Sequence, residues 1–174
     1  MRNLQPLTPE DAPGKSKELL GDIVGRHGSA GDMVSTMAHS PALLQGYLDL
    51  SRSMKRVKMP RALSEKISLA LQEWIGCGTC MIAHIEAGQA AGLSDTDITL
   101  ARQGTSTDVR EAALMGFALR VLTEPSSLTP EDVAALREHG WNDRVISELV
   151  GLVTLNMLTG SFNLVAGIQP DTRP

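Results

Sequence analysis

Residues 60–92 restrict the fold more than any other stretch of the chain, because two helical patterns are separated there by Gly76 and Gly78. Pro60 suits the first turn of the first helix. Apolar residues then recur at the spacing of one packed helical face, namely Leu63, Ile67, Ala70, Leu71 and Trp74. The second pattern ends at Gly92, a residue type that commonly terminates helices. The stretch therefore predicts an antiparallel helical hairpin whose first helix is about four turns long.

The only two cysteines of the chain, Cys77 and Cys80, fall at the bend of this hairpin, where its second helix starts. At 100° per residue, these cysteines and His84 lie within about 60° of one another. One helical stripe therefore carries both sulfurs and an imidazole. Small residues continue the stripe, namely Ala87, Gly88 and Ala91. Because small residues let a neighbouring helix approach closely, we expect the stripe to face protein rather than bulk water.

Glu65 precedes the bend and His84 follows it by a similar number of residues. In an antiparallel hairpin the two come level, so the carboxylate can reach the imidazole. The reactive form of cysteine is the thiolate, which a helix N-terminus or a nearby imidazolium favours. Glu65 points away from the face that carries Leu63, while Lys66 and Glu73 mark the exposed side about a quarter turn away. We therefore expect this helix to be covered on two faces, with Glu65 on the second.

The pattern Glu65-x11-Cys77-x2-Cys80-x3-His84 resembles that of the alkylhydroperoxidase AhpD family, the redox branch of the carboxymuconolactone decarboxylase-like superfamily. The resemblance implies that Cys80 is the thiol that attacks peroxide and that Cys77 is the more accessible, resolving thiol. It also implies that Glu65 and His84 form the proton relay that activates Cys80. Some members place a second histidine directly before the second cysteine, where this chain has Thr79.

This resemblance implies a thiol-dependent peroxidase or disulfide oxidoreductase. The Cys80 thiolate would attack the O–O bond of a hydroperoxide, and the resulting sulfenic acid would condense with Cys77. An external dithiol would then reduce the disulfide, and in the family this dithiol is typically a dihydrolipoyl group on a partner protein. We expect no metal and no other cofactor. The resemblance further implies a homo-oligomer, a trimer or a hexamer, in which neighbouring subunits cover the stripe from Cys77 to Ala91.

Two other functions stay open at this stage. One is a lyase like the muconolactone decarboxylases, which transfer protons without sulfur chemistry, although those branches generally lack the dithiol. The other is a helical module without catalysis that is held together by zinc, with Cys77, Cys80, His84 and Glu65 as ligands. Three ligands so close to one helix start make an awkward zinc site. Met81 excludes c-type haem attachment, which requires histidine directly after the second cysteine.

The remaining helices are predicted from capping residues, prolines and glycines, and they cover residues 15 to 25, 41 to 54, 94 to 104, 107 to 123, 129 to 140 and 142 to 165. The last helix is apolar on most sides, so we expect it to lie at the centre or between subunits. Its polar residues Asn156, Ser161 and Asn163 could reach a pocket, but the sequence does not place them. No alternating strand pattern is present.

We therefore predict an all-α fold, an AhpD-like helical bundle whose central αα-hairpin carries the CxxC motif. The expected organisation is a single domain over residues 1–174. Within it, residues 1–58 form an N-terminal helical arm, residues 60–122 a core with the redox motif, and residues 129–167 the C-terminal helices. The pattern compatible with the family runs from about residue 60 to 122.

Composition excludes several classes of partner. The net charge is −4, no basic stripe is present, and aromatic residues make up only 3% of the chain, so we expect no nucleic acid partner. We expect that no apolar run approaches the ~20 residues of a membrane span, and residues 1–14 contain no hydrophobic signal region. We therefore expect a cytoplasmic protein without a membrane partner. In such a reducing compartment, a CxxC pair favours redox or metal chemistry over a structural disulfide.

Overall fold

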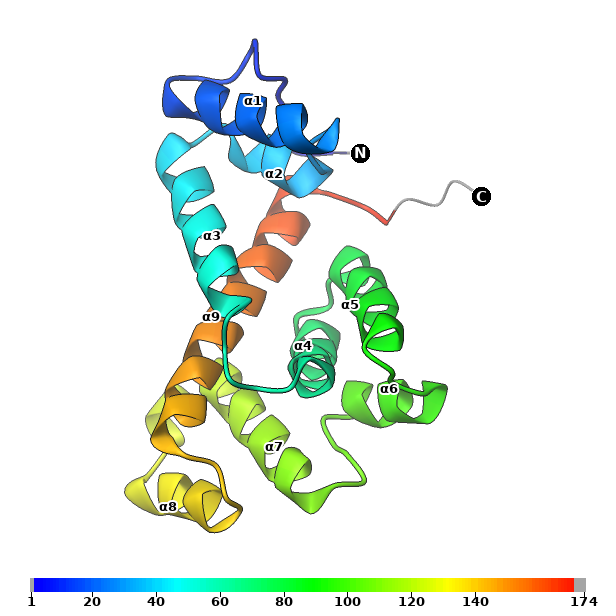
Figure 1. Cartoon of the computed structure of the whole chain (residues 1–174), viewed down its shortest axis with the longest axis vertical. Coiled ribbons are helices and arrows are strands. Elements are labelled where there is room, and N and C mark those ends of the chain that lie inside the picture. Colours follow the sequence, from blue (N-terminus) through cyan, green and yellow to red (C-terminus); the bar gives the residue numbers. More distant parts are fainter. Residues whose placement is uncertain (1, 171–174) are drawn as a thin grey trace.

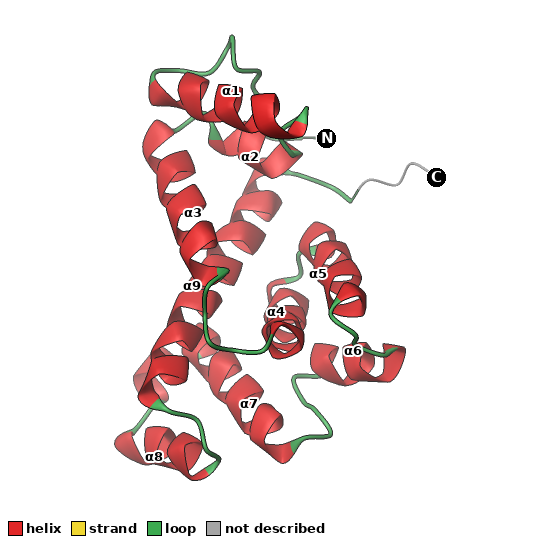
Figure 2. Cartoon of the chain, in the orientation of Figure 1, coloured by secondary structure: helices red, strands yellow, loops and turns green. Residues whose placement is uncertain are grey.

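The computed structural model describes residues 2–170, and these form only helices and their connecting loops (Figures 1 and 2). The helices are α1 (Lys15–His27), α2 (Asp32–Met37), α3 (Pro41–Met54), α4 (Arg61–Ile75), α5 (Gly78–Ala90), α6 (Asp95–Arg102), α7 (Val109–Thr123), the 3₁₀ turn η1 (Pro125–Ser127), α8 (Pro130–Glu138) and α9 (Asp143–Ala166). The predicted all-α fold is confirmed, and the two cysteines lie at the bend of the α4–α5 hairpin.

Helix α9 is the element on which the others are assembled. It packs against α2, α3, α4, α5, α7 and α8. Figure 1 shows α1, α2 and α3 at one end of α9, α7 and α8 at the other, and the α4–α5–α6 group beside it. Within residues 2–170, α9 is also the one helix that is long and apolar enough to cross a membrane. We did not predict an apolar stretch of this length from the sequence. Its contacts with six other helices identify it as the central helix of this fold.

Most helices begin where the sequence predicts, because local polar side chains satisfy the free N–H groups of the first turn. The Ser40 hydroxyl accepts a hydrogen bond from the N–H of Leu43 at the start of α3. Ser94 and Asp97 form the predicted capping box of α6. Helix α2 was not predicted. It has only six residues and no side-chain cap, so packing of its buried residues, rather than a local signal, holds it in place.

The apolar interior consists of two clusters. The larger one joins α4, α6, α7, α8 and the first half of α9. The smaller one lies in the N-terminal arm, where Leu20, Met37 and Leu44 pack with Leu158 and Phe162 from the second half of α9. The arm is therefore fixed to the second half of α9, and α3 lines the same pocket as Cys80.

Two residues of α4 differ from the sequence-based expectation. Leu63 and Ile67 are fully buried, as expected, but Trp74 at the end of the same face is 61% exposed. Lys66, expected on the exposed side, is buried because α6 and α7 cover that side of α4. Its ammonium lies 2.8 Å from a carboxylate oxygen of Glu111. Burial lowers the pKa of Lys66, but Glu111 and Asp97 outweigh it, so the pKa lies above its usual value.

Helices α4 and α9 cross closely at Gly160, and this contact generates a stability prediction. A Cβ atom at Gly160 would lie 2.6 Å from Oε1 of Gln72 and 2.9 Å from Ile75. We expect Gly160→Ala to lower the free energy of unfolding by about 1–3 kcal/mol through overpacking. A Cβ atom at Gly116 in α7 would meet no neighbour within 4 Å, so Gly116→Ala should instead stabilise by up to about 1 kcal/mol. Urea denaturation measures the free energy of unfolding of both variants. Equal changes in the two variants would contradict the close contact of α4 and α9 at Gly160.

Candidate active site

The bend between α4 and α5 fixes the positions of both cysteines. Helix α4 ends at Gly76, which has a φ of 81°, a left-handed conformation that glycine adopts without strain. The carbonyl of Gln72 accepts hydrogen bonds from the N–H groups of both Gly76 and Cys77. Cys77 is then the N-cap of α5, and its sulfur accepts a hydrogen bond from the N–H of Cys80 at 3.3 Å. Both sulfurs therefore lie at a helix N-terminus, where negative charge is stabilised.

The sulfurs of Cys77 and Cys80 are bonded to each other, so the structure represents the oxidised form of the dithiol. Cys77 is 2% exposed and Cys80 is 7% exposed. The expectation that Cys77 is the more accessible thiol is therefore wrong for this form. Only Cys80 lines the pocket described below.

The segment after α9 lies beside the residues that follow Cys77. It runs past the first turn of α5, where the Thr79 hydroxyl donates a hydrogen bond to the carbonyl of Ile168 at 3.2 Å. A Cβ atom on Gly78 would lie 3.6 Å from the ring of Pro170. Thr79 therefore ties this segment to the first turn of α5.

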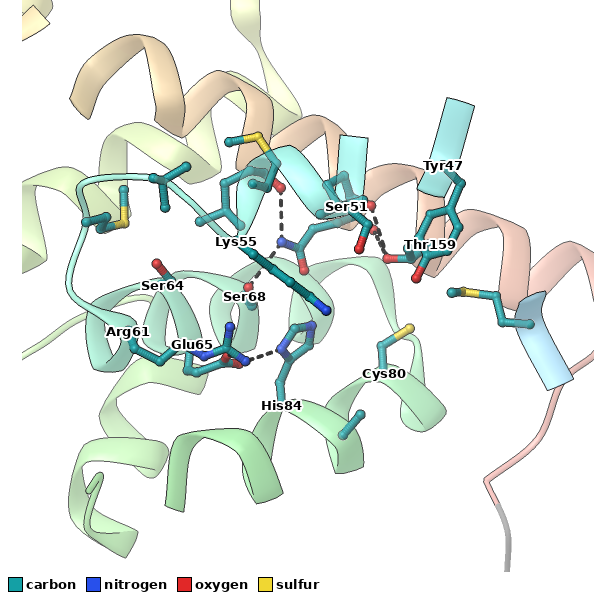
Figure 3. Close-up of a pocket in the computed structure, with 18 of the residues that line it drawn as sticks. Tyr47, Ser51, Lys55, Arg61, Ser64, Glu65, Ser68, Cys80, His84 and Thr159 are labelled. Carbon is teal, nitrogen blue, oxygen red and sulfur yellow. Dashed lines mark hydrogen bonds and ion pairs between the residues drawn. The ribbon is translucent and has the colours of Figure 1, made fainter. Parts of the chain in front are cut away.

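Glu65 and His84 meet as expected from the sequence. Oε2 of Glu65 lies 2.7 Å from Nδ1 of His84, and Oε1 lies 2.6 Å from the guanidinium of Arg61 (Figure 3). Glu65 is 3% exposed, so both carboxylate oxygens are buried with partners. An ionised carboxylate only accepts hydrogen bonds, so Nδ1 of His84 donates. The other ring nitrogen, Nε2, is thereby left as an acceptor on the pocket side.

Asn163 in α9, one of the three polar residues that the sequence suggested could reach a pocket but did not place, contacts the sulfurs. Its side-chain N–H group donates to the sulfur of Cys80 at 3.3 Å and lies 3.8 Å from that of Cys77. Asn163 is buried, and its amide oxygen has no hydrogen-bond partner within the described part of the chain. An amide donor at this position stabilises a thiolate on Cys80 more than a thiol. The feature of the sequence that indicated a buried role for Asn163 is its position as a polar residue in an otherwise apolar helix.

A cavity of about 430 Å³ opens above Cys80. Its floor is formed by the hairpin and α9, and the N-terminal arm with the loop before α4 forms its roof (Figure 3). The lining residues are Met33, Tyr47, Ser51, Met54, Lys55, Val57, Met59, Arg61, Ser64, Glu65, Ser68, Thr79, Cys80, Ala83, His84, Leu152, Leu155, Asn156, Thr159 and Asn163. Three of the four predicted site residues, Cys80, His84 and Glu65, therefore share one pocket.

The arm contributes groups that the motif does not contain. Tyr47 of α3 reaches the pocket, and burial raises the pKa of its phenol, an effect that a hydrogen bond with Ser51 partly offsets. The phenol is therefore uncharged at neutral pH and able to donate a hydrogen bond. Lys55 follows the last turn of α3 and lines the same pocket.

In this disulfide form, the site residues do not form a zinc site. The two sulfurs are bonded to each other, and the Glu65 carboxylate is directed at Arg61 and His84 rather than at the sulfurs. Within residues 2–170, no group of three or more His, Cys, Asp or Glu side chains is arranged to hold a metal ion.

Comparison with known proteins gives similarity at the level of structure. No protein-family model and no curated protein sequence matches the chain. An AhpD core protein from Ralstonia eutropha JMP134, described as peroxidase-related, superposes with a TM-score of 0.78 at 19% identity, covering 94% of this chain and 89% of its own. A peroxidase-related protein from Silicibacter sp. TM1040 gives 0.77 at 16% identity, covering 92% and 87%.

The debrominase Bmp8 is also similar. Its apo structure gives a TM-score of 0.76 at 19% identity, covering 98% of this chain and 92% of its own. A complex of a cysteine-to-alanine Bmp8 variant with 2,3,4-tribromopyrrole gives 0.75 at 18% identity. All of these structures share one helical arrangement with the chain, and at such identities the similarity establishes the fold alone.

Proposed function

We propose that this chain, which has the AhpD-like fold, is a thiol-dependent peroxidase of that superfamily. The observation that supports the proposal most is the position of Cys80. Its sulfur lines a pocket together with His84, whose imidazole is held by the buried carboxylate of Glu65. A second thiol, Cys77, lies within bonding distance of Cys80.

The first step forms a sulfenic acid. In the reduced protein, His84 accepts the thiol proton of Cys80 through its free Nε2, and Glu65 stabilises the resulting imidazolium. The Cys80 thiolate attacks one peroxide oxygen, the O–O bond breaks, and the leaving alkoxide takes a proton from His84. The side-chain N–H group of Asn163 stabilises the thiolate before the attack.

The second step forms the disulfide. The thiol of Cys77 attacks the sulfenic sulfur of Cys80, and water leaves. A dithiol, for example a dihydrolipoyl group on a partner protein, then reduces the disulfide and is itself oxidised. Because the cycle needs a continuous supply of reducing thiols, we propose that the protein works in a reducing compartment, the cytoplasm.

A second candidate function is reductive debromination of a small aromatic ring, supported by the similarity to Bmp8 over nearly the whole chain and by the apolar lining of the pocket. In this reaction a C–Br bond is replaced by C–H and bromide is released. The two thiols supply both electrons and two protons and become the disulfide. Release of bromide from 2,3,4-tribromopyrrole by the reduced protein would favour this candidate over peroxide reduction.

Single cysteine variants test the peroxidase directly. We expect Cys80→Ser to abolish consumption of cumene hydroperoxide, because it removes the nucleophile. Cys77→Ser should still form a sulfenic acid on Cys80 that dimedone labels, because only the resolving thiol is missing. Mass spectrometry of both labelled variants measures the outcome. Equal labelling of the two variants would overturn the assignment of roles.

The relay is tested by the pH dependence of alkylation. We expect Glu65→Gln and His84→Gln each to move the midpoint for iodoacetamide alkylation of Cys80 upward by about one pH unit, because each weakens the base that accepts the thiol proton. Glu73→Gln is the matched control, since Glu73 is an exposed carboxylate on the same helix that pairs with Arg102. An unchanged midpoint in both site variants would leave Glu65 and His84 with a structural role only.

We also propose that the protein forms a homo-oligomer, a trimer or a hexamer, through one face of α9. Val150, Met157 and Leu164 recur every seven residues on this helix and are about half exposed. By contrast, Gly88 in the cysteine stripe is already covered by Leu93 and Glu65 of its own chain. We expect light scattering to give a multiple of 18.6 kDa and Met157→Glu to reduce it. A mass of 18.6 kDa for the unmodified chain would contradict the proposal.

A further inference from the structure

The charges that line the pocket above Cys80 are unequal. Its charged lining residues are one carboxylate, Glu65, and two cations, Lys55 and Arg61, and the imidazole of His84 also lines it. Arg61 binds one oxygen of Glu65 and His84 binds the other. The charge of Glu65 is therefore matched by that of Arg61, and Lys55 contributes one additional positive charge to the pocket.

Lys55 has no internal anion. Within residues 2–170 no carboxylate oxygen lies within 4.0 Å of its ammonium. Its position after the last turn of α3 explains why a cation is favoured there, since helix C-termini attract positive charge. The position of Lys55 at the end of the helix does not explain why its side chain is directed into the pocket. Figure 3 shows the side chain extending over the pocket, with its amino end toward His84.

The rest of the lining indicates the size and polarity of a ligand. The cavity of about 430 Å³ is many times the roughly 10–15 Å³ that one water molecule requires, so it is far larger than hydrogen peroxide needs. Part of its wall is apolar and includes Met33, Met54, Val57, Met59, Leu152 and Leu155. Such walls suit an aromatic or short alkyl group.

We propose that the preferred substrate is a small organic hydroperoxide that carries a carboxylate. The carboxylate pairs with Lys55, the apolar body lies against the methionine and leucine side chains, and the peroxide faces Cys80. This inference rests on the proposed function in one respect, namely that the group of the substrate that reacts with Cys80 is a peroxide. Recognition of an organic anion by Lys55 does not require catalysis and is measured separately.

Binding to the disulfide form tests the anion site without chemistry. The probes are 4-isopropylbenzoate and the uncharged 4-isopropylbenzamide, which share one shape, and calorimetry measures their Kd values. We expect the benzoate to bind about three- to fivefold more tightly, the range of a solvent-accessible ion pair. Lys55→Met should remove this preference and Lys55→Glu should reverse it. Lys58→Met is the control, because Lys58 is an exposed lysine of the same loop that does not line the pocket.

Turnover of two hydroperoxides tests the substrate class. Cumene hydroperoxide and its 4-carboxylate differ only in the charged group. We expect the 4-carboxylate to have the lower KM in the unmodified protein and in Lys58→Met. In Lys55→Met the two KM values should converge, and the difference in the unmodified protein should shrink as salt rises.

The outcomes separate this inference from the proposed function. Equal binding of benzoate and benzamide, or a preference that survives Lys55→Met, overturns the anion site even if both hydroperoxides are consumed. Selective benzoate binding that depends on Lys55, without consumption of either hydroperoxide, supports the anion site and overturns the peroxidase. Selective binding together with a Lys55-dependent KM difference supports both.

Discussion

The site depends on a carboxylate that is almost completely buried. An isolated charge at the position of Glu65 would be strongly destabilised, so its two oxygens need partners. Arg61 approaches one oxygen from the preceding turn of α4, and His84 approaches the other from α5. This arrangement gives both carboxylate oxygens a partner, fixes the ring of His84 and directs the second ring nitrogen into the pocket. The α4–α5 hairpin is thus held by the same contact that, in the proposed mechanism, prepares a base near Cys80.

Helix α9 and the N-terminal arm provide the parts of the site that the α4–α5 hairpin does not contain. α9 brings the amide of Asn163 to the sulfurs, and the segment after α9 is hydrogen-bonded to Thr79 between the two cysteines. The arm packs on the second half of α9 through the smaller apolar cluster and so forms the roof of the pocket. In the proposed function, the hairpin therefore supplies the reactive groups, whereas the arm supplies lining residues such as Tyr47 and Lys55 that would contact the remainder of a ligand. Differences in the arm would change substrate preference without changing the motif.

Much of this architecture was predictable because it is encoded locally. Capping residues such as Ser94 and Asp97 marked helix starts, and the hairpin geometry was sufficient to predict the contact between Glu65 and His84. The errors concern tertiary packing. The exposure of Trp74, the burial of Lys66 and the lower accessibility of Cys77 depend on which distant segments cover each helix face. No spacing rule within one helix contains that information.

Our central claim is that the dithiol of this chain reduces hydroperoxides without a metal. The most direct measurement is a thiol titration and intact mass of the fully reduced protein after one equivalent of cumene hydroperoxide, with a metal assay on the same sample. We predict the loss of both thiols per chain, a mass lower by two hydrogen atoms and no stoichiometric metal. Two thiols that persist after the treatment, or one zinc ion per chain that protects them, would contradict the claim.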